Sequence, residues 1–172
     1  MRTLLATLAA VALVGVAATA ATAAPARTAK LTPAEAKWAA PVVTLWNTIN
    51  ASLQNLTRAA SAKDALLVGT TNNLALTVLL SRFTACGKSL TKAGTAPPRL
   101  ATFAGVMKAA CTRVSAGGHS FARAVGAIHK KNSTLASKLV IQGYGEFKQG
   151  TSKLALARRQ LLALGGKKIF AA

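Results

Sequence analysis

Apolar side chains recur at steps of three or four residues along four stretches of the chain, as they do on one face of an α-helix. The stretches run from Trp38 to Ala60, from Leu76 to Leu90, from Leu100 to Ile128 and from Leu139 to Leu164. The third keeps this rhythm with the least interruption. No stretch alternates apolar and polar residues as a half-buried strand does. The pattern predicts an all-α protein.

Turn and capping residues set the ends of the first two predicted helices. Thr32 to Glu35 forms a capping box with proline at the first helical position, so the first helix starts near Pro33. Pro41 is expected to kink that helix or end its first two turns, because proline lacks the backbone N–H donor. Ser61 to Asp64 is a second capping box, before a helix that ends at Gly94. Residues 69–73, at the start of this second helix, also suit a loop.

The remaining boundaries complete the expected fold. Pro97 and Pro98 open the third helix, Ser133 caps the fourth, and Gly165 with Gly166 ends it. Four helices of roughly 30 residues each would be rods of about 45 Å. Because the connections are short, neighbouring helices are expected to be antiparallel. The sequence therefore predicts an antiparallel up-down four-helix bundle.

The two cysteines fall on neighbouring predicted helices, Cys86 on the second and Cys111 on the third. Cys86 is 7 residues before the end of its helix at Ala93 and Cys111 is 13 residues after Pro98, an offset of 6 residues (13 − 7) or about 9 Å. The connection can supply this rise, because residues before proline are held extended. We therefore predict one inter-helix disulfide, as suits an exported protein. Two separately buried thiols, the alternative, would suit a cytosolic protein.

Residues 1–23 have the pattern of a secretory signal peptide. Arg2 gives a charged start, Leu4 to Val16 an apolar run, and Ala21 to Ala23 a small-residue cleavage site, with Ala24 to Ala26 as a second candidate. The apolar run is shorter than the roughly 20 residues that span a bilayer. We expect a secreted, extracytoplasmic protein, and its alanine-rich composition is bacterial in style.

The chain left after cleavage is strongly basic. It would consist of an exposed segment at residues 24–32 and one helical-bundle domain at residues 33–172. Without Arg2, 21 Lys and Arg residues stand against 3 acidic ones, so the mature net charge is 21 − 3 = +18. Such a chain attracts polyanions. Anionic wall polymer, an anionic membrane surface and nucleic acid are the partners to consider.

An up-down bundle would gather much of this charge at one end, where the first and third helices start and the second and fourth end. We predict an anion-binding surface there, formed by Arg27, Lys30, Lys37, Lys88, Lys92, Arg99, Arg158, Arg159, Lys167 and Lys168. Cations in a last helical turn also complement the helix dipole, which accounts for Lys167 and Lys168 without a ligand. The dipole does not account for Lys37 and Arg99 near helix starts. Functional attraction and compositional bias both stay open as explanations.

Recognition of nucleic-acid bases by stacking needs exposed aromatic residues among the cations. Tyr144 is the single tyrosine, and Trp38 and Trp46 lie on or beside the core stripe of the first helix. Nucleic-acid binding is therefore expected to be nonspecific and strongly weakened by salt.

The titratable residues do not form a catalytic or metal-binding set. Glu35, Asp64 and Glu146 fall on three different helices, without the histidine spacing of a di-iron bundle. His119 and His129 are 10 residues, or about 15 Å, apart on one helix, too far to bind one metal ion together. We interpret His129 as a cap at a helix end and His119 as a surface or boundary residue rather than a single haem ligand. We expect a non-enzymatic protein with no cofactor.

The layout of a signal peptide, Trp38 on a first helix, and Cys86 and Cys111 on either side of Pro97-Pro98 resembles uncharacterised secreted helical-bundle proteins of actinobacteria. The resemblance covers most of the mature chain. It implies a helical bundle outside the membrane, and it implies no function and no site residue.

Two main functions fit these observations. The first is a non-enzymatic protein held by its basic end to an anionic cell-envelope polymer or to lipid headgroups. The second is an extracellular carrier of an apolar ligand or haem, and it would need space between the helices. Glycines that would provide such space, or would serve close helix contact instead, are Gly69, Gly117, Gly118, Gly143 and Gly150. Nonspecific nucleic-acid binding is a further alternative.

Overall fold

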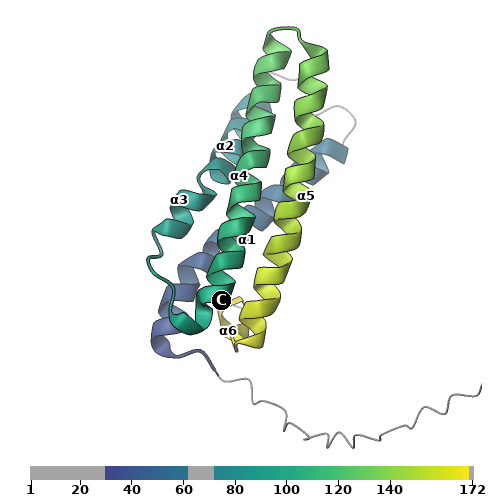
Figure 1. Ribbon diagram of the computed structural model, residues 1–172. Helices are drawn as coiled ribbons and strands as arrows, with labels where there is room; N and C mark the ends of the chain where they lie inside the picture. Colours follow the sequence, from purple (N-terminus) through teal and green to yellow (C-terminus); the bar gives the residue numbers. More distant parts are fainter. Residues whose placement is uncertain (1–29, 62–71, 171–172) are drawn as a thin grey trace, which may run out of the picture.

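All secondary structure is helical in the computed structural model, which describes residues 30–61 and 72–170 (Figure 1). The elements are α1 (Pro33–Ser61), α2 (Asn72–Thr84), α3 (Cys86–Thr91), the 3₁₀ turn η1 (Pro98–Leu100), α4 (Ala101–His129), α5 (Ser133–Ala163) and α6 (Lys167–Phe170). The predicted signal peptide, Arg27 and Gly69 lie outside the described residues. So do most of the segment at 24–32 and of the second capping box.

Helices α4 and α5 form a long antiparallel hairpin (Figure 1). Two glycines let the helices approach, each covered by an aromatic ring of the other helix. A Cβ atom at Gly117 would lie 2.6 Å from the ring of Phe147, and one at Gly143 would lie 2.5 Å from the ring of Phe121. The two rings stack on each other with centroids 5.4 Å apart. These glycines therefore serve close helix packing.

The second predicted helix is broken at Ala85 into α2 and α3, which corrects the prediction of one helix that continues to Gly94. The Ser115 hydroxyl of α4 donates to the carbonyl oxygens of Phe83 and Thr84, at 2.9 and 3.3 Å. These carbonyls belong to the last turn of α2, where a helix supplies no N–H partners of its own. A side chain from another helix therefore stabilises the break.

The predicted start of the first helix is confirmed. The Glu35 carboxylate accepts a hydrogen bond from the Thr32 backbone N–H at 2.8 Å, and the Thr32 hydroxyl accepts one from the Glu35 N–H at 3.3 Å. This reciprocal pair is a capping box. The helix then continues through Pro41 to Ser61, so Pro41 does not end it.

Residues with positive φ follow α3, α4 and α5. Gly94 and Gly165, predicted as helix ends, have φ angles of 77° and 89°. Lys131 has φ of 55° after α4, although it is not glycine. Asn132 caps α5 in place of the predicted Ser133, because its side-chain oxygen accepts a hydrogen bond from the Leu135 N–H at 3.0 Å.

The disulfide between Cys86 and Cys111 joins α3 to α4, with Cα atoms 5.2 Å apart. Both residues are part of the main hydrophobic core, in which Phe83, Phe103 and Met107 are buried. The prediction of an all-helical protein with one inter-helix disulfide is confirmed.

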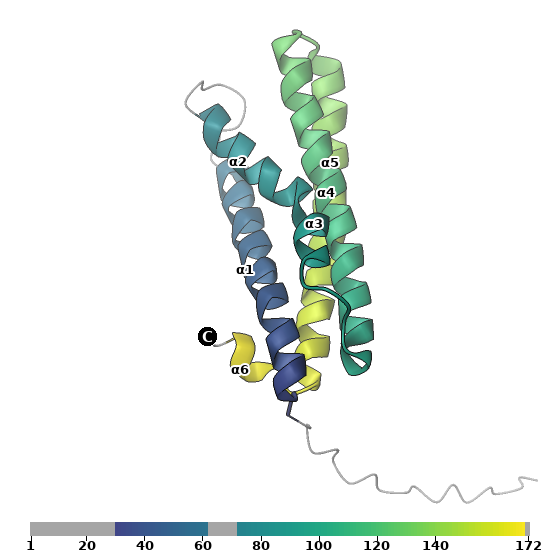
Figure 2. The ribbon, with the colours of Figure 1, turned by 90° about the vertical axis from the view of Figure 1, so that its left-hand side faces the viewer.

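The elements are not packed as four straight parallel rods. Figure 2 shows α1 and α2 on one side of the hairpin, both leaning away from it near the α4–α5 turn; α2 approaches the hairpin partway along it, and α1 approaches it at the other end. Figure 2 also shows α3 against α4, as the disulfide requires. The start of α1 and the end of α5, where the basic surface was predicted, lie at the end where α1 approaches the hairpin.

Candidate functional site

Arg99 joins three segments of the chain through hydrogen bonds. Its Nη1 donates to Glu35 Oε2 at 3.2 Å and to the backbone oxygen of Lys30 at 3.4 Å. Its Nη2 donates to the backbone oxygen of Leu164 at 3.2 Å. The start of α1, the η1 turn and the end of α5 are therefore side by side. Arg99, predicted as an anion-binding residue, has a structural role here that the sequence did not reveal.

Trp38 brings the chain after α3 to the same end. Its indole N–H donates to the backbone oxygen of Gly94 at 3.1 Å, and its ring meets Phe103 edge-on with centroids 6.2 Å apart. Trp38 is thus engaged in packing, as expected from its place on the core stripe.

The predicted lysines at this end project into solvent. Glu35 is paired with Arg99 at 3.2 Å, and Glu146 with Arg113 at 3.1 Å. Over residues 30–61 and 72–170, these ion pairs engage both carboxylates, and no lysine is in an ion pair. The exposed lysines of the predicted set at this end are Lys30, Lys37, Lys92, Lys167 and Lys168.

Arg158 and Arg159 are both exposed, but Arg158 also packs against aromatic rings. The guanidinium carbon of Arg158 lies 5.8 Å from the centroid of Trp46 and 5.6 Å from that of Phe170, within cation–π range. The Trp46 indole N–H also donates to the backbone oxygen of Leu154 at 3.0 Å. Arg158 therefore helps to hold α6 against α1. Lys88, the last member of the set, lies on α3 and lines a groove beside α4.

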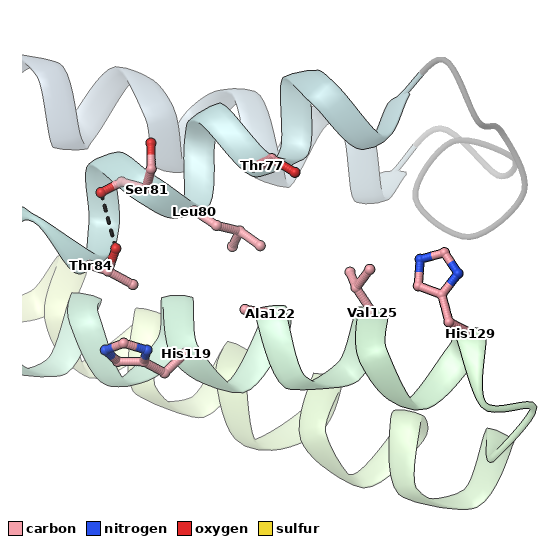
Figure 3. A pocket seen from close by; sticks show the side chains of 8 residues that line it. All are labelled: Thr77, Leu80, Ser81, Thr84, His119, Ala122, Val125 and His129. Atoms are coloured by element: carbon pink, nitrogen blue, oxygen red, sulfur yellow. Dashed lines mark hydrogen bonds between the residues drawn. The ribbon is translucent and has the colours of Figure 1, made fainter.

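Two histidines mark the ends of a second groove, of about 490 Å³, between α2 and α4 (Figure 3). Leu80, Ala122 and Val125 lie between His119 and His129, and both histidines are exposed. Within the described part of the chain, no three His, Cys, Asp or Glu side chains gather where they could hold a metal ion. His129 is the last residue of α4, at the helix end where it was predicted.

The glycines considered for a carrier pocket are used for packing where they are described. A Cβ atom at Gly118 would lie 3.0 Å from Phe83 Cβ, and one at Gly150 would lie 2.8 Å from a methyl carbon of Val114. Together with Gly117 and Gly143, these positions leave no space between the helices beside them for a ligand.

The disulfide suggests an oxidising environment outside the cytoplasm, where such bonds persist. Among the described helices, none combines the length and the hydropathy of a membrane span. No protein-family model, curated protein or solved structure matches the chain.

Proposed function

We propose that this chain is a secreted, non-enzymatic basic protein that associates with an anionic polymer or with anionic lipid headgroups of the cell envelope. The binding surface consists of the exposed cations at the end where α1 starts and α5 ends. In this proposal the molecule is an up-down arrangement of four segments, namely α1, the broken pair α2 and α3, α4, and α5.

The observation that carries the proposal is the pairing of the carboxylates. Arg99 engages Glu35 and Arg113 engages Glu146, so neither carboxylate is available to neutralise the exposed lysines. An unneutralised group of cations attracts polyanions. The helix dipole does not explain Lys37, because a cation near a helix start is disfavoured.

The proposal can be tested by binding of the purified protein to teichoic acid, phosphatidylglycerol vesicles and duplex DNA, each across a salt series. We expect retention on teichoic acid or on the vesicles at about 0.15 M salt, where exposed charges are screened beyond about 8 Å. Binding to DNA should fall steeply with salt and be equal for unrelated sequences. Loss of all three together below that salt concentration would contradict the proposal.

A matched pair of variants locates the binding surface. Replacing Arg159, Lys167 and Lys168 by Gln removes three charges from the proposed surface, and Arg158 is kept because it packs against Trp46. The control replaces Lys130 and Lys131, at the turn between α4 and α5, and Lys138, near the start of α5, by Gln. The first variant should elute from teichoic acid at distinctly lower salt than the control. Equal elution would mean that binding depends only on net charge.

A carrier of an apolar ligand or haem between the helices is the second candidate. Its support is weaker, because Gly117 and Gly143 are covered by aromatic rings. Absorbance after haem addition tests it: a Soret shift that His119→Ala abolishes would favour the carrier.

A further inference from the structure

A groove of about 820 Å³ between α3 and α4 is separate from the exposed lysines around α6. Trp38, Gly94 and Ala96 line one end of it, and Cys111 lies along its length. The disulfide from Cys111 to α3 fixes the two walls relative to each other. The two walls of the groove are thus linked covalently at Cys86 and Cys111.

Two lysines flank the groove at the same height. Lys88 follows Cys86 by two residues and Lys108 precedes Cys111 by three. Because α3 and α4 run in opposite directions (Figure 2), both lysines lie on the same side of the disulfide, by about 3 and 4.5 Å along the helix axes. Both line the groove and are exposed, and neither is in an ion pair with a carboxylate of the described residues.

Toward Trp38 the groove has an apolar stretch that is held open by glycine, whereas Thr112, Ser115 and His119 line its other part together with Thr91. Leu90 on α3 and Ala104 with Gly105 on α4 line it, and Gly105 is one turn from Lys108 on the same helix face. A Cβ atom at Gly87 or at Gly105 would meet nothing within 4 Å. These glycines therefore do not serve helix packing, although glycine inside a helix costs about 1 kcal/mol relative to alanine.

We propose that this groove binds an amphipathic anion with a single apolar chain. The anionic head would lie between Lys88 and Lys108, and the chain would lie over Gly105 toward Trp38. Two cations at one height suit one compact anionic group, such as a carboxylate or a phosphate. A polymer with charges along its whole length would leave the apolar wall exposed to water, so the groove favours a small amphiphile over the polyanion of the proposed function.

The test is calorimetric titration with decanoate below its micellar concentration. We expect one saturable site in the parent protein, and affinity at least tenfold weaker in Gly105→Leu, whose side chain would fill the groove. The substitution leaves charge unchanged, a Cβ atom at this position meets nothing within 4 Å, and leucine is a better helix former than glycine, so the melting temperature should not fall. Retention on teichoic acid should also be unchanged, which separates a failure of this proposal from a failure of the proposed function.

A charge-matched pair tests the head position. The double variant Lys88→Gln with Lys108→Gln should weaken decanoate binding at least tenfold. The control, Lys138→Gln with Lys148→Gln on α5, should change the affinity by no more than about twofold, because these lysines do not line the groove. Decyltrimethylammonium, with the opposite head charge, should not displace decanoate. Unchanged affinity in Gly105→Leu, or equal losses in the two lysine pairs, would overturn the proposal and identify nonspecific attraction to a basic protein.

Discussion

At the scale of single residues, Lys131 is the position where sequence and backbone disagree. Its N–H donates to the oxygen of Ile128 at 2.8 Å, and the next N–H, of Asn132, donates to the oxygen of Ala127 at 2.9 Å. These two bonds form the Schellman motif, whose left-handed residue is usually glycine. Gly165 fills that place after α5, with φ of 89°. Lys131 adopts φ of 55° with a side chain present.

Replacing Lys131 by Gly should therefore raise the free energy of unfolding by about 0.5–1 kcal/mol. An L-residue in the left-handed region costs about 1–2 kcal/mol, and the larger backbone entropy that glycine loses on folding offsets part of this gain. Urea unfolding measures the change. Lys131→Gln is the control, since it removes the charge and keeps the strain. Gly165→Ala should lower stability by a similar amount. Equal stability of Lys131→Gly and Lys131→Gln would contradict the argument.

Tyr144 gives a pH dependence that can be read directly. Burial raises the pKa of its phenol above the ordinary value of about 10, and Phe121 packs edge-on against the ring at 5.1 Å. The folded-state pKa is higher than the unfolded one. The contribution of the neutral Tyr144 phenol to stability is therefore complete below pH ~10 and is lost as pH rises through the folded-state pKa. The chain has one tyrosine, so phenolate absorbance reports it alone. Its midpoint should fall on unfolding in urea, and identical midpoints in both states would refute the assignment.

At the scale of elements, the sequence predicted what is local and missed what depends on distant contacts. Apolar periodicity located the helices, and the capping box at residues 32–35 located the start of α1. The break at Ala85 could not be predicted, because Ser115 of another helix stabilises it. The short helix α6 was missed for the same reason, since Arg158 and Trp46 hold it from α5 and α1.

The packing of α4 on α5 yields a paired prediction on one helix. Gly143→Ala would place Cβ 2.5 Å from the buried Phe121 ring, and overpacking of this kind costs about 1–3 kcal/mol. Gly145→Ala meets nothing within 4 Å, so better helix propensity alone should stabilise the protein by up to about 1 kcal/mol. Urea unfolding of the two variants should thus shift in opposite directions. If both stabilise the protein, the close approach of the helices is wrong.

At the scale of the molecule, the candidate surface was only partly predictable. The predicted antiparallel order placed the start of the first helix near the end of the fourth, and Arg99 makes hydrogen bonds to Glu35 of α1 and to Leu164 after α5. The sequence did not separate cations used in packing from cations left in solvent. Arg99 and Arg158 belong to the first kind because Glu35 and Trp46 hold them, and these partners are remote in sequence. The groove beside Lys88 lies between α3 and α4, and apolar periodicity alone does not show that a groove forms there.

The same imbalance of charge predicts how the whole fold responds to salt. The chain has a formal net charge of +19, and ion pairs engage the carboxylates Glu35 and Glu146 of the described residues, so repulsion among cations opposes folding. Raising sodium chloride from 0.01 to 0.15 M shortens the screening length from about 30 to about 8 Å, and stability in urea should rise. The Arg99–Glu35 pair is partly buried, with side-chain exposures of 35% and 8%, so salt should weaken it less than a fully exposed pair. Lys148→Glu with Lys153→Glu should flatten the salt dependence. A parent protein that loses stability with added salt would mean that its ion pairs outweigh the repulsion.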